Sequence, residues 1–218
     1  MAKVLQDFLH AWLRAIRKKS FIIEVIITIV AMVLLLNIFD MNVAHVEARG
    51  GAVLDDPILT PINTLDFTWQ TFAVIYFASL LTLIQVIQKP EYMVKCIQAF
   101  TLVLFFRMIT MYLTPLRYPE DMIPLVDPFV QFIFNSDQVW KNDLFFSGHT
   151  SSLVMMYFFV KGKWMKTILL VSSVLVGIFV ILQHVHYTID VVAAPFFAWG
   201  AWSIVKKVNL EFFLAESK

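Results

Sequence analysis

Cysteine and charged residues are scarce in this sequence, and each of these features excludes certain classes of protein. Cys96 is the only cysteine, which excludes an intramolecular disulfide framework. Charged residues make up 15% of the 218 positions and the net charge is +1, so charge implies no nucleic acid or other polyanion as a partner. We find no internal repeat and no low-complexity tract.

The sequence also shows no pattern of a cleavable secretion signal ahead of its first long apolar stretch. No basic start, short apolar run and small-residue cleavage site precede the first long apolar stretch, so we expect that stretch to be a retained anchor. Hydrophobic residues, by contrast, make up 60% of the chain, and the mean hydropathy is +0.76. A soluble domain of this length could not cover so much apolar surface with polar side chains. In a lipid bilayer the apolar side chains can face the lipid instead. The sequence therefore predicts an integral membrane protein.

Six stretches approach the roughly 20 apolar residues that cross the hydrocarbon core of a bilayer. They predict an all-α fold, a six-transmembrane-helix bundle. The third, fourth and sixth are the less hydropathic ones: the third contains Arg107, the fourth Ser147, Gly148 and His149, and the sixth begins with Tyr187, Thr188 and Asp190. Polar groups at membrane depth are costly and therefore indicate functional positions. The expected spans are residues 21–39, 67–88, 93–114, 144–160, 164–182 and 187–205.

The positions of lysine and arginine predict an orientation, because cytoplasmic loops carry an excess of both. Most fall on the N-terminal segment, the second and fourth connections and the tail, whereas Arg49, Arg117 and Lys141 fall on the other side. We therefore expect both termini in the cytoplasm and the first, third and fifth connections on the non-cytoplasmic face. The expected domains are a cytoplasmic amphipathic and basic segment (1–20), a six-span catalytic membrane domain (21–205) and a cytoplasmic tail (206–218).

Two segments outside the spans have features of their own. Residues 4–17 mix apolar and basic positions at helical spacing, which fits either an interfacial amphipathic helix or a short cytoplasmic helix that only supplies positive charge. The third connection, 115–143, is long, contains helix-breaking prolines and includes the apolar run 129–134. We expect it to form a lid on the outer membrane surface.

The segment Phe-Phe-Ser-Gly-His-Thr, residues 145–150, stands where the third connection enters the fourth span. A Ser147–Gly148 pair at a helix start leaves backbone N–H groups without partners, and the helix dipole adds positive potential there. Phosphate oxygens can bind at such a helix start, with His149 beside them. A serine N-cap followed by a chance histidine would give the same letters.

The segment Gln-His-Val-His-Tyr-Thr-Ile-Asp, residues 183–190, falls at the fifth connection and so on the same face. His186 and Asp190 are four residues apart, which lets them touch on a helix. A carboxylate bonded to one imidazole nitrogen fixes the tautomer, leaves the other nitrogen free and stabilises the cation that forms when histidine attacks phosphorus. The alternative, a helix start with Asp190 in water, is weakened by the Val-Val-Ala-Ala that follows.

Arg107 lies near the outer end of the third span, where it needs a partner. Arginine binds phosphate oxygens bidentately, but a structural ion pair with Asp143 or Glu24 would serve as well. These polar groups all map to one side of one membrane, which favours phosphoryl transfer.

Metal binding is the main rival use of His184, His186, His149 and Asp190. The His-x-His pair can chelate, but the remaining ligands would have to come from outer loops.

At these residues the sequence resembles the sphingomyelin synthase family, a branch of the type 2 phosphatidic acid phosphatase superfamily. The segments that carry the resemblance are Asp-Leu-Phe-Phe-Ser-Gly-His-Thr (143–150), His-Val-His-Tyr-Thr-Ile-Asp-Val (184–191) and Arg-Met-Ile-Thr-Met-Tyr-Leu-Thr-Pro-Leu (107–116). Two departures stand out. Val180 occupies a position at which the wider superfamily usually has arginine, and the family's first outer-loop motif is matched only loosely by Leu-Asp-Asp-Pro (54–57).

The resemblance implies a ping-pong transfer that requires no metal and no cofactor. It implies His186 as the nucleophile, Asp190 as the group that orients it, and His149 as the acid and base. The residues expected to bind substrate or phosphate are Arg107, Ser147, Gly148, His184, Lys141 and Asp143.

Three functions stay open. A lipid phosphotransferase would move a phospho-head group from a phospholipid donor to the hydroxyl of a lipid acceptor such as a ceramide or diacylglycerol. A lipid phosphate phosphatase would pass the same phosphohistidine intermediate to water. A transporter or membrane scaffold would use the intramembrane polar residues to bind a solute, but it predicts matched broken spans in two halves, which the sequence lacks.

Overall fold

The computed structural model describes residues 2–128, 140–209 and 212. Within this part the chain is helical and has no strand, apart from one isolated bridge between Ala52 and Leu116. The predicted all-α class is therefore confirmed for the described residues. The helices are α1 (Ala2–Ile16), α2 (Lys19–Arg49), α3 (Thr68–Val86), α4 (Pro90–Leu113), α6 (Gly148–Phe159), α7 (Lys163–Leu182) and α8 (Thr188–Val208).

Five helices, α2, α3, α4, α7 and α8, are long and apolar enough to cross a membrane. The protein is thus a multi-pass integral membrane protein. Local sequence explains where the spans begin. Proline at the first position of α4 has a fixed φ that suits a helix start. Gly162, which precedes α7, adopts a φ of 93° that side chains disfavour.

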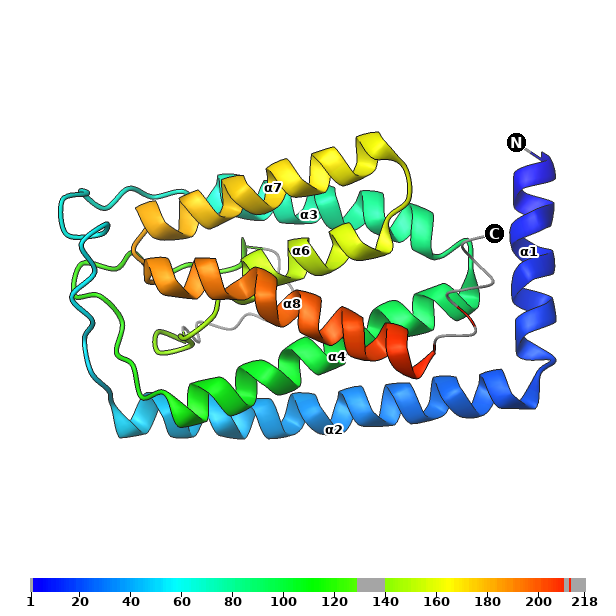
Figure 1. Ribbon diagram of the computed structural model, residues 1–218, viewed down its shortest axis with the longest axis horizontal. Coiled ribbons are helices and arrows are strands. Elements are labelled where there is room, and N and C mark those ends of the chain that lie inside the picture. The colour runs from blue at the N-terminus through cyan, green and yellow to red at the C-terminus, as the bar shows by residue number, and fades with distance from the viewer. Residues whose placement is uncertain (1, 129–139, 210–211, 213–218) are drawn as a thin grey trace.

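The short helix α6 takes the place of the expected fourth span. It has 12 residues, a length of about 18 Å, whereas the hydrocarbon core is about 30 Å thick. The helix starts only at Gly148 because Phe145 has a φ of 100°, outside the helical region. It packs against α3, α4, α7 and α8 in the middle of the bundle (Figure 1). The expected six spans are therefore represented by five long helices and one short central helix.

Helix α2 continues to Arg49, well past the expected end of the first span at residue 39. Its polar extension is held by the end of α4. Asn42 donates to the carbonyl of Met108 at 3.2 Å, and Arg49 donates to the carbonyls of Met111 and Tyr112 at 2.6 and 2.5 Å. Since α2 and α4 pack along one another, the carbonyls at the end of α4 provide acceptors for polar side chains that hydropathy alone assigns to a loop.

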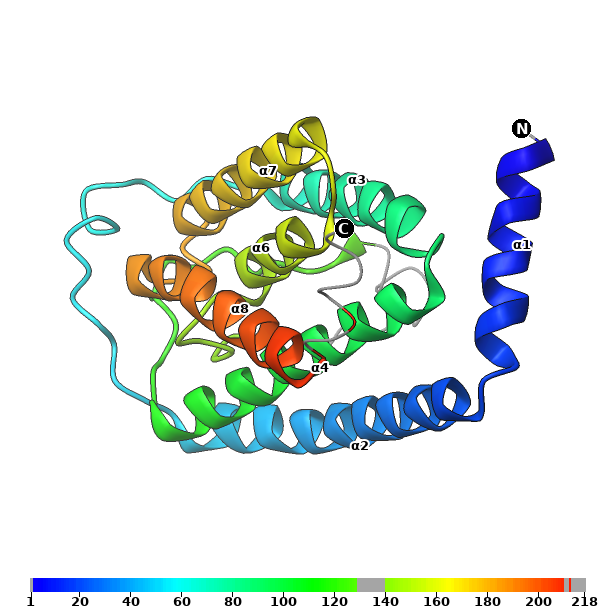
Figure 2. The same ribbon diagram turned by 45° about the vertical axis from the view of Figure 1, so that its right-hand side comes forward.

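The connections lie at two opposite ends of the bundle, as Figures 1 and 2 both show. One end, which we call the basic end, carries α1, the α3–α4 connection at 87–89 and the α6–α7 connection at 160–162. The other, the loop end, carries residues 50–67, the described parts of 114–147 and residues 183–187. This alternation agrees with the predicted one, and it places the starts of α6 and α8 toward the same end.

The three connections at the loop end are tied together by backbone hydrogen bonds. Ala52 donates to the carbonyl of Pro115 at 2.9 Å and accepts from Arg117 at 2.9 Å, and Ile123 donates to the carbonyl of Gln183 at 3.2 Å. Residue 51 is glycine because an added Cβ would lie 2.5 Å from the backbone of Leu116. The apolar run 129–134 of the expected lid lies outside the described residues.

Candidate active site

The start of α6 is built around Ser147. It is the N-cap, and its side chain accepts a 3.3 Å hydrogen bond from the backbone N–H of Thr150. Gly148 and His149 follow as the first two helical residues. The predicted Ser-Gly helix start is therefore confirmed, and it leaves N–H groups of the first turn without acceptors inside the helix.

The start of α8 places His186 against Asp190. The Nδ1 atom of His186 lies 3.1 Å from a carboxylate oxygen of Asp190, and the same oxygen accepts the backbone N–H of Tyr187 at 3.1 Å. Both side chains are buried, with exposed fractions of 3% and 0%. The contact expected from four-residue spacing is present, and it leaves Nε2 as the ring nitrogen available for attack.

One backbone hydrogen bond joins these two helix starts. The N–H of Ser147 donates to the carbonyl of Asp190 at 3.0 Å. As a result, the ring centroids of His149 and His186 are 6.5 Å apart with 63° between their planes. The His149 ring also makes a T-shaped contact with the Phe72 ring, with 5.8 Å between centroids. The two imidazoles could act on the same phosphorus atom from opposite sides.

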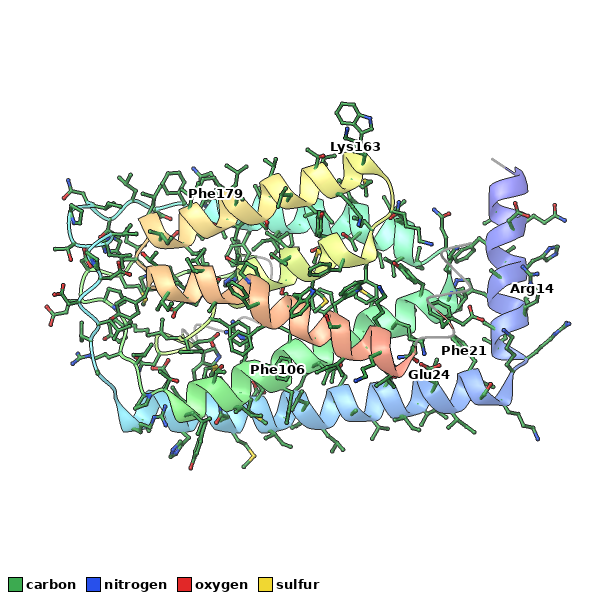
Figure 3. All side chains as sticks on the ribbon, in the orientation of Figure 1. Arg14, Phe21, Glu24, Phe106, Lys163 and Phe179 are labelled. Atoms are coloured by element: carbon green, nitrogen blue, oxygen red, sulfur yellow. The ribbon has the colours of Figure 1, made fainter. Side chains whose placement is uncertain are left out.

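Arg107 reaches the same place from α4. It forms an ion pair with Asp143, and its Nη1 donates to the carbonyl of Phe146 at 2.8 Å. Of the two ion-pair partners left open by the sequence, Asp143 is the one found, because Glu24 lies toward the basic end and pairs with Lys95 (Glu24 is labelled in Figure 3). The guanidinium lies so close to Gly148 that a Cβ there would be 2.3 Å from Nη1. Glycine is therefore what lets the arginine approach the helix start.

An apolar cavity of about 390 Å³ opens beside these residues. Its polar wall is Arg107, Asp143, Gly148 and His149, together with Ser152 of α6 and Thr101 of α4. The rest is lined by apolar side chains from three helices: Met32 and Phe39 of α2, Ile75 of α3, and Phe100, Val103 and Leu104 of α4. The volume lies in the range of about 300–1,000 Å³ typical of ligand pockets. The cavity thus combines a polar, cationic site with an apolar wall that hydrocarbon chains can contact.

Two of the expected binding residues lie elsewhere. The Lys141 ammonium sits 5.2 Å from the centroid of the Tyr118 ring and does not line the cavity. His184, with a φ of 54°, turns its Nδ1 to Asp121 at 2.9 Å, and Thr64 donates to the other oxygen of that carboxylate at 2.8 Å. This pair connects the first, third and fifth connections. Hydrogen bonding to His184 and Thr64, opposed by desolvation, lowers the pKa of Asp121.

Sequence reasoning missed two acidic residues that hold the site together. Glu47 of α2 accepts the backbone N–H groups of Lys141 and Asn142 at 2.5 and 2.6 Å, and the Asn142 amide at 2.9 Å. These bonds fix the segment that ends in Asp143. Nothing in the sequence around Glu47 signals this role, because its partners are more than ninety residues away.

Asp56 plays the same part for α8. Its carboxylate accepts the N–H of Thr188 at 2.7 Å and the Thr188 hydroxyl at 3.1 Å, and thus caps the helix that carries Asp190. Partial burial acts to raise the pKa of Asp56, but the hydrogen bonds from Thr188, Ile58 and Leu59 outweigh it, so the pKa is lowered. The loose match of residues 54–57 to the family's first outer-loop motif was the only signal for it.

Among the described residues, no group of three or more histidine, cysteine, aspartate or glutamate side chains is arranged to hold a metal ion. His184 is drawn toward Asp121, whereas His186 and Asp190 form their own pair.

Comparison with models of protein families gives a match within the second half of the chain. The family model described as PAP2 superfamily C-terminal matches residues 142–207, which contain the starts of both α6 and α8. No curated protein matches the chain. The matched region contains His149, His186 and Asp190, and also the backbone hydrogen bond from Ser147 to Asp190 that joins the starts of α6 and α8. Together with the membrane spans, the match supports the PAP2 superfamily, which suggests a membrane lipid enzyme of the phosphatase or phosphotransferase type.

Proposed function

We propose that this protein is a lipid phosphotransferase resembling sphingomyelin synthase, with residues 21–205 as its catalytic membrane domain. It moves a phospho-head group from a phospholipid to a lipid hydroxyl of the ceramide or diacylglycerol type. The observation that carries the proposal is the pair of imidazoles 6.5 Å apart, one hydrogen-bonded to a buried carboxylate and the other on the wall of an apolar cavity.

The geometry supports a two-step reaction. In the first step, Nε2 of His186 attacks the phosphorus atom, the bond from phosphorus to the lipid oxygen breaks, and His149 gives that oxygen a proton. Asp190 stabilises the charge that develops on the His186 ring. In the second step, His149 takes the proton of the acceptor hydroxyl, whose oxygen attacks phosphorus and releases His186.

The phosphate group needs donors while it is transferred. The first-turn N–H groups of α6 supply them from one side, with the favourable end of the helix dipole. The guanidinium of Arg107 lies against Gly148 and adds positive charge beside them. Its ion pair with Asp143 holds the side chain in place, so Arg107 serves as a fixed electrostatic partner of the phosphate.

The cavity supports a lipid as the substrate. Its apolar wall begins directly beside Gly148 and His149 and extends to Met32 and Phe100. Hydrocarbon in this space would exclude water from the phosphohistidine, which favours a lipid hydroxyl over water as the acceptor. Hydrolysis, the alternative, uses the same intermediate and differs only in what attacks it.

The site is proposed to face the non-cytoplasmic side of the membrane. The starts of α6 and α8 point to the loop end, and most lysines and arginines lie toward the basic end. A cysteine placed at exposed Asp55 of the loop end should react with an impermeant thiol reagent only from the non-cytoplasmic side, in a chain whose buried Cys96 is unreactive.

The nucleophile is tested by trapping the intermediate. The purified protein is incubated with phospholipid that carries a labelled phosphate, and the adduct should be acid-labile and base-stable. His186→Ala should abolish it, whereas His45→Ala, an exposed histidine on α2, should leave it unchanged. An adduct that survives in His186→Ala would assign the nucleophile to another residue.

Two further assays separate the roles. His149→Ala should block turnover of ordinary phospholipids but spare an activated ester, because a good leaving group needs no proton. Equal losses on both substrates would contradict the acid role. With ceramide and diacylglycerol supplied, mass spectrometry should find a new phospholipid or phosphosphingolipid. Free phosphorylated head group without a new lipid would establish hydrolysis instead.

A further inference from the structure

Helix α1 presents three different faces. Phe8, Ala11, Trp12 and Ala15 form the stripe nearest the bundle: Ala15 is 1% exposed, and the indole N–H of Trp12 donates to the carbonyl of Ile87 at 2.9 Å. The polar stripe holds Asp7, His10 and Arg14, the last of which lies on the side turned away from the bundle in Figure 3. The third stripe is apolar and exposed. It consists of Leu5, Leu9, Leu13 and Ile16, which are 59%, 49%, 47% and 47% exposed.

The exposed apolar stripe recurs at intervals of three and four residues, so it forms one continuous face. Within the described residues, no segment of the chain covers it. On a helix surrounded by water, such a face would be costly, at about 25 cal/mol for each Å² of apolar surface. The face therefore indicates a partner other than the described residues of the chain.

The position of α1 identifies that partner. Figures 1 and 2 show α1 lying across the direction of the membrane-spanning helices, at the basic end of the bundle. Its anchor residue Trp12 is bonded at Ile87, directly beyond the end of α3, and so at the level where a span leaves the hydrocarbon core. At that level, an apolar face running parallel to the membrane plane meets the boundary between acyl chains and head groups.

The charges around α1 fit the same place. Arg14 and Arg17 lie on its polar side, and Lys18 forms an ion pair with Glu91 at the start of α4 at 3.1 Å. Lysines and arginines at this depth interact favourably with anionic head groups, whereas the neighbouring leucines lie deeper. The alternative of a helix free in the aqueous phase accounts for the charges but not for the exposed leucines.

We propose that α1 is an interfacial helix, bound in the membrane plane by Leu5, Leu9, Leu13 and Ile16, with Arg14 directed to the aqueous side. It adds a membrane-surface contact to the spans and fixes the start of α2 at the level of the head groups.

Spin labelling of the full chain tests this proposal. In a Cys96→Ala background, single nitroxides are placed at Leu9 and Leu13 on the apolar stripe and at the matched neighbours His10 and Arg14. The protein is reconstituted in vesicles of phosphatidylcholine and phosphatidylglycerol. Oxygen, which concentrates in the bilayer, and a water-soluble nickel chelate serve as collision partners. Exposed Phe196 of α8 and exposed Asp55 supply the lipid and water limits.

The expected ratio of oxygen to nickel accessibility at Leu9 and Leu13 is about fivefold or more above that at His10 and Arg14, with the first pair near the Phe196 value. Equal nickel accessibility at all four positions would place α1 in water and overturn the proposal. Protection of Leu9 and Leu13 from both reagents would also overturn it, because it would mean that protein covers the stripe. The same elution volume as the unlabelled protein in size-exclusion chromatography shows that each labelled protein is folded.

Discussion

A single methyl group at position 148 should disable the site without unfolding the protein. The Cβ of Gly148→Ala would stand 2.3 Å from Nη1 and 2.7 Å from Cζ of Arg107. Carbon atoms attract best at about 3.5–4.0 Å, so the guanidinium has to retreat by about 1 Å or more. It cannot do so freely, because Nη1 is bonded to the carbonyl of Phe146 and Nη2 is paired with Asp143.

The size of the effect follows from that displacement. Misplacing a positioned group by about 1 Å costs on the order of 10²-fold in rate. Overpacking of a buried site costs about 1–3 kcal/mol of stability. We therefore expect kcat/KM for phospholipid to fall by about 10²-fold in Gly148→Ala, with a folded protein whose thermal midpoint is lowered by a few degrees.

The assay compares Gly148→Ala with Gly200→Ala in detergent micelles, by turnover and thermal unfolding. Gly200 is a glycine within α8 whose added Cβ would meet its nearest neighbour, in Phe106, only at 4.0 Å, so this variant should keep turnover within about twofold. In a double-mutant cycle, Gly148→Ala should cost little once Arg107 is already lysine. Wild-type turnover in Gly148→Ala, or full additivity with Arg107→Lys, would refute the idea that the glycine serves the arginine.

Three further variants test the supports of the site. Asp190→Asn should lower turnover by up to about 10⁴-fold, since an amide can hold the wrong tautomer of His186; normal turnover would show that the carboxylate takes no part in the chemistry. Glu47→Ala should lower the thermal midpoint, because buried N–H donors lose their acceptor at a cost of about 1–3 kcal/mol, and an unchanged midpoint would contradict the role of Glu47. Because the pKa of Asp56 is lowered from 3.8 in the fold, its stabilising effect is present at neutral pH and is lost as pH falls below about 4. Thermal unfolding between pH 3 and 7 should show a smaller acid-dependent loss of stability in Asp56→Asn than in the wild type. Equal losses would show that Asp56 does not contribute to the acid-dependent loss.

The spans that hydropathy predicts well are those whose ends carry local signals. Pro90 marks the start of α4, and Gly162 marks the start of α7. Both helices therefore lie within a few residues of their expected bounds. Hydropathy alone begins the fourth span at residue 144, ahead of the start of α6 at Gly148, because it does not register the positive φ of Phe145. The extension of α2 was missed because its polar side chains are satisfied by carbonyls of another helix.

The candidate site divides in the same way. The spacing of four residues and the Ser-Gly pair predicted the His186–Asp190 contact and the start of α6, since both are local in sequence. The roles of Glu47 and Asp56 depend on contacts between segments more than ninety residues apart, which one sequence does not reveal. Lys141 was among the residues expected to bind substrate or phosphate, but its ammonium lies over the Tyr118 ring.

The bond between Ser147 and Asp190 explains how one histidine could serve both steps of the proposed transfer. His149 has to give a proton to one lipid oxygen and later take a proton from another at the same place. Its distance from His186 is set by the backbone hydrogen bond between Ser147, two residues before His149, and Asp190, four residues after His186. Flexible side chains do not set this distance. Asp56 holds the same turn of α8 from the first connection. In the proposed ping-pong reaction, the two lipids would exchange in the apolar cavity while this backbone bond keeps the distance between His149 and His186.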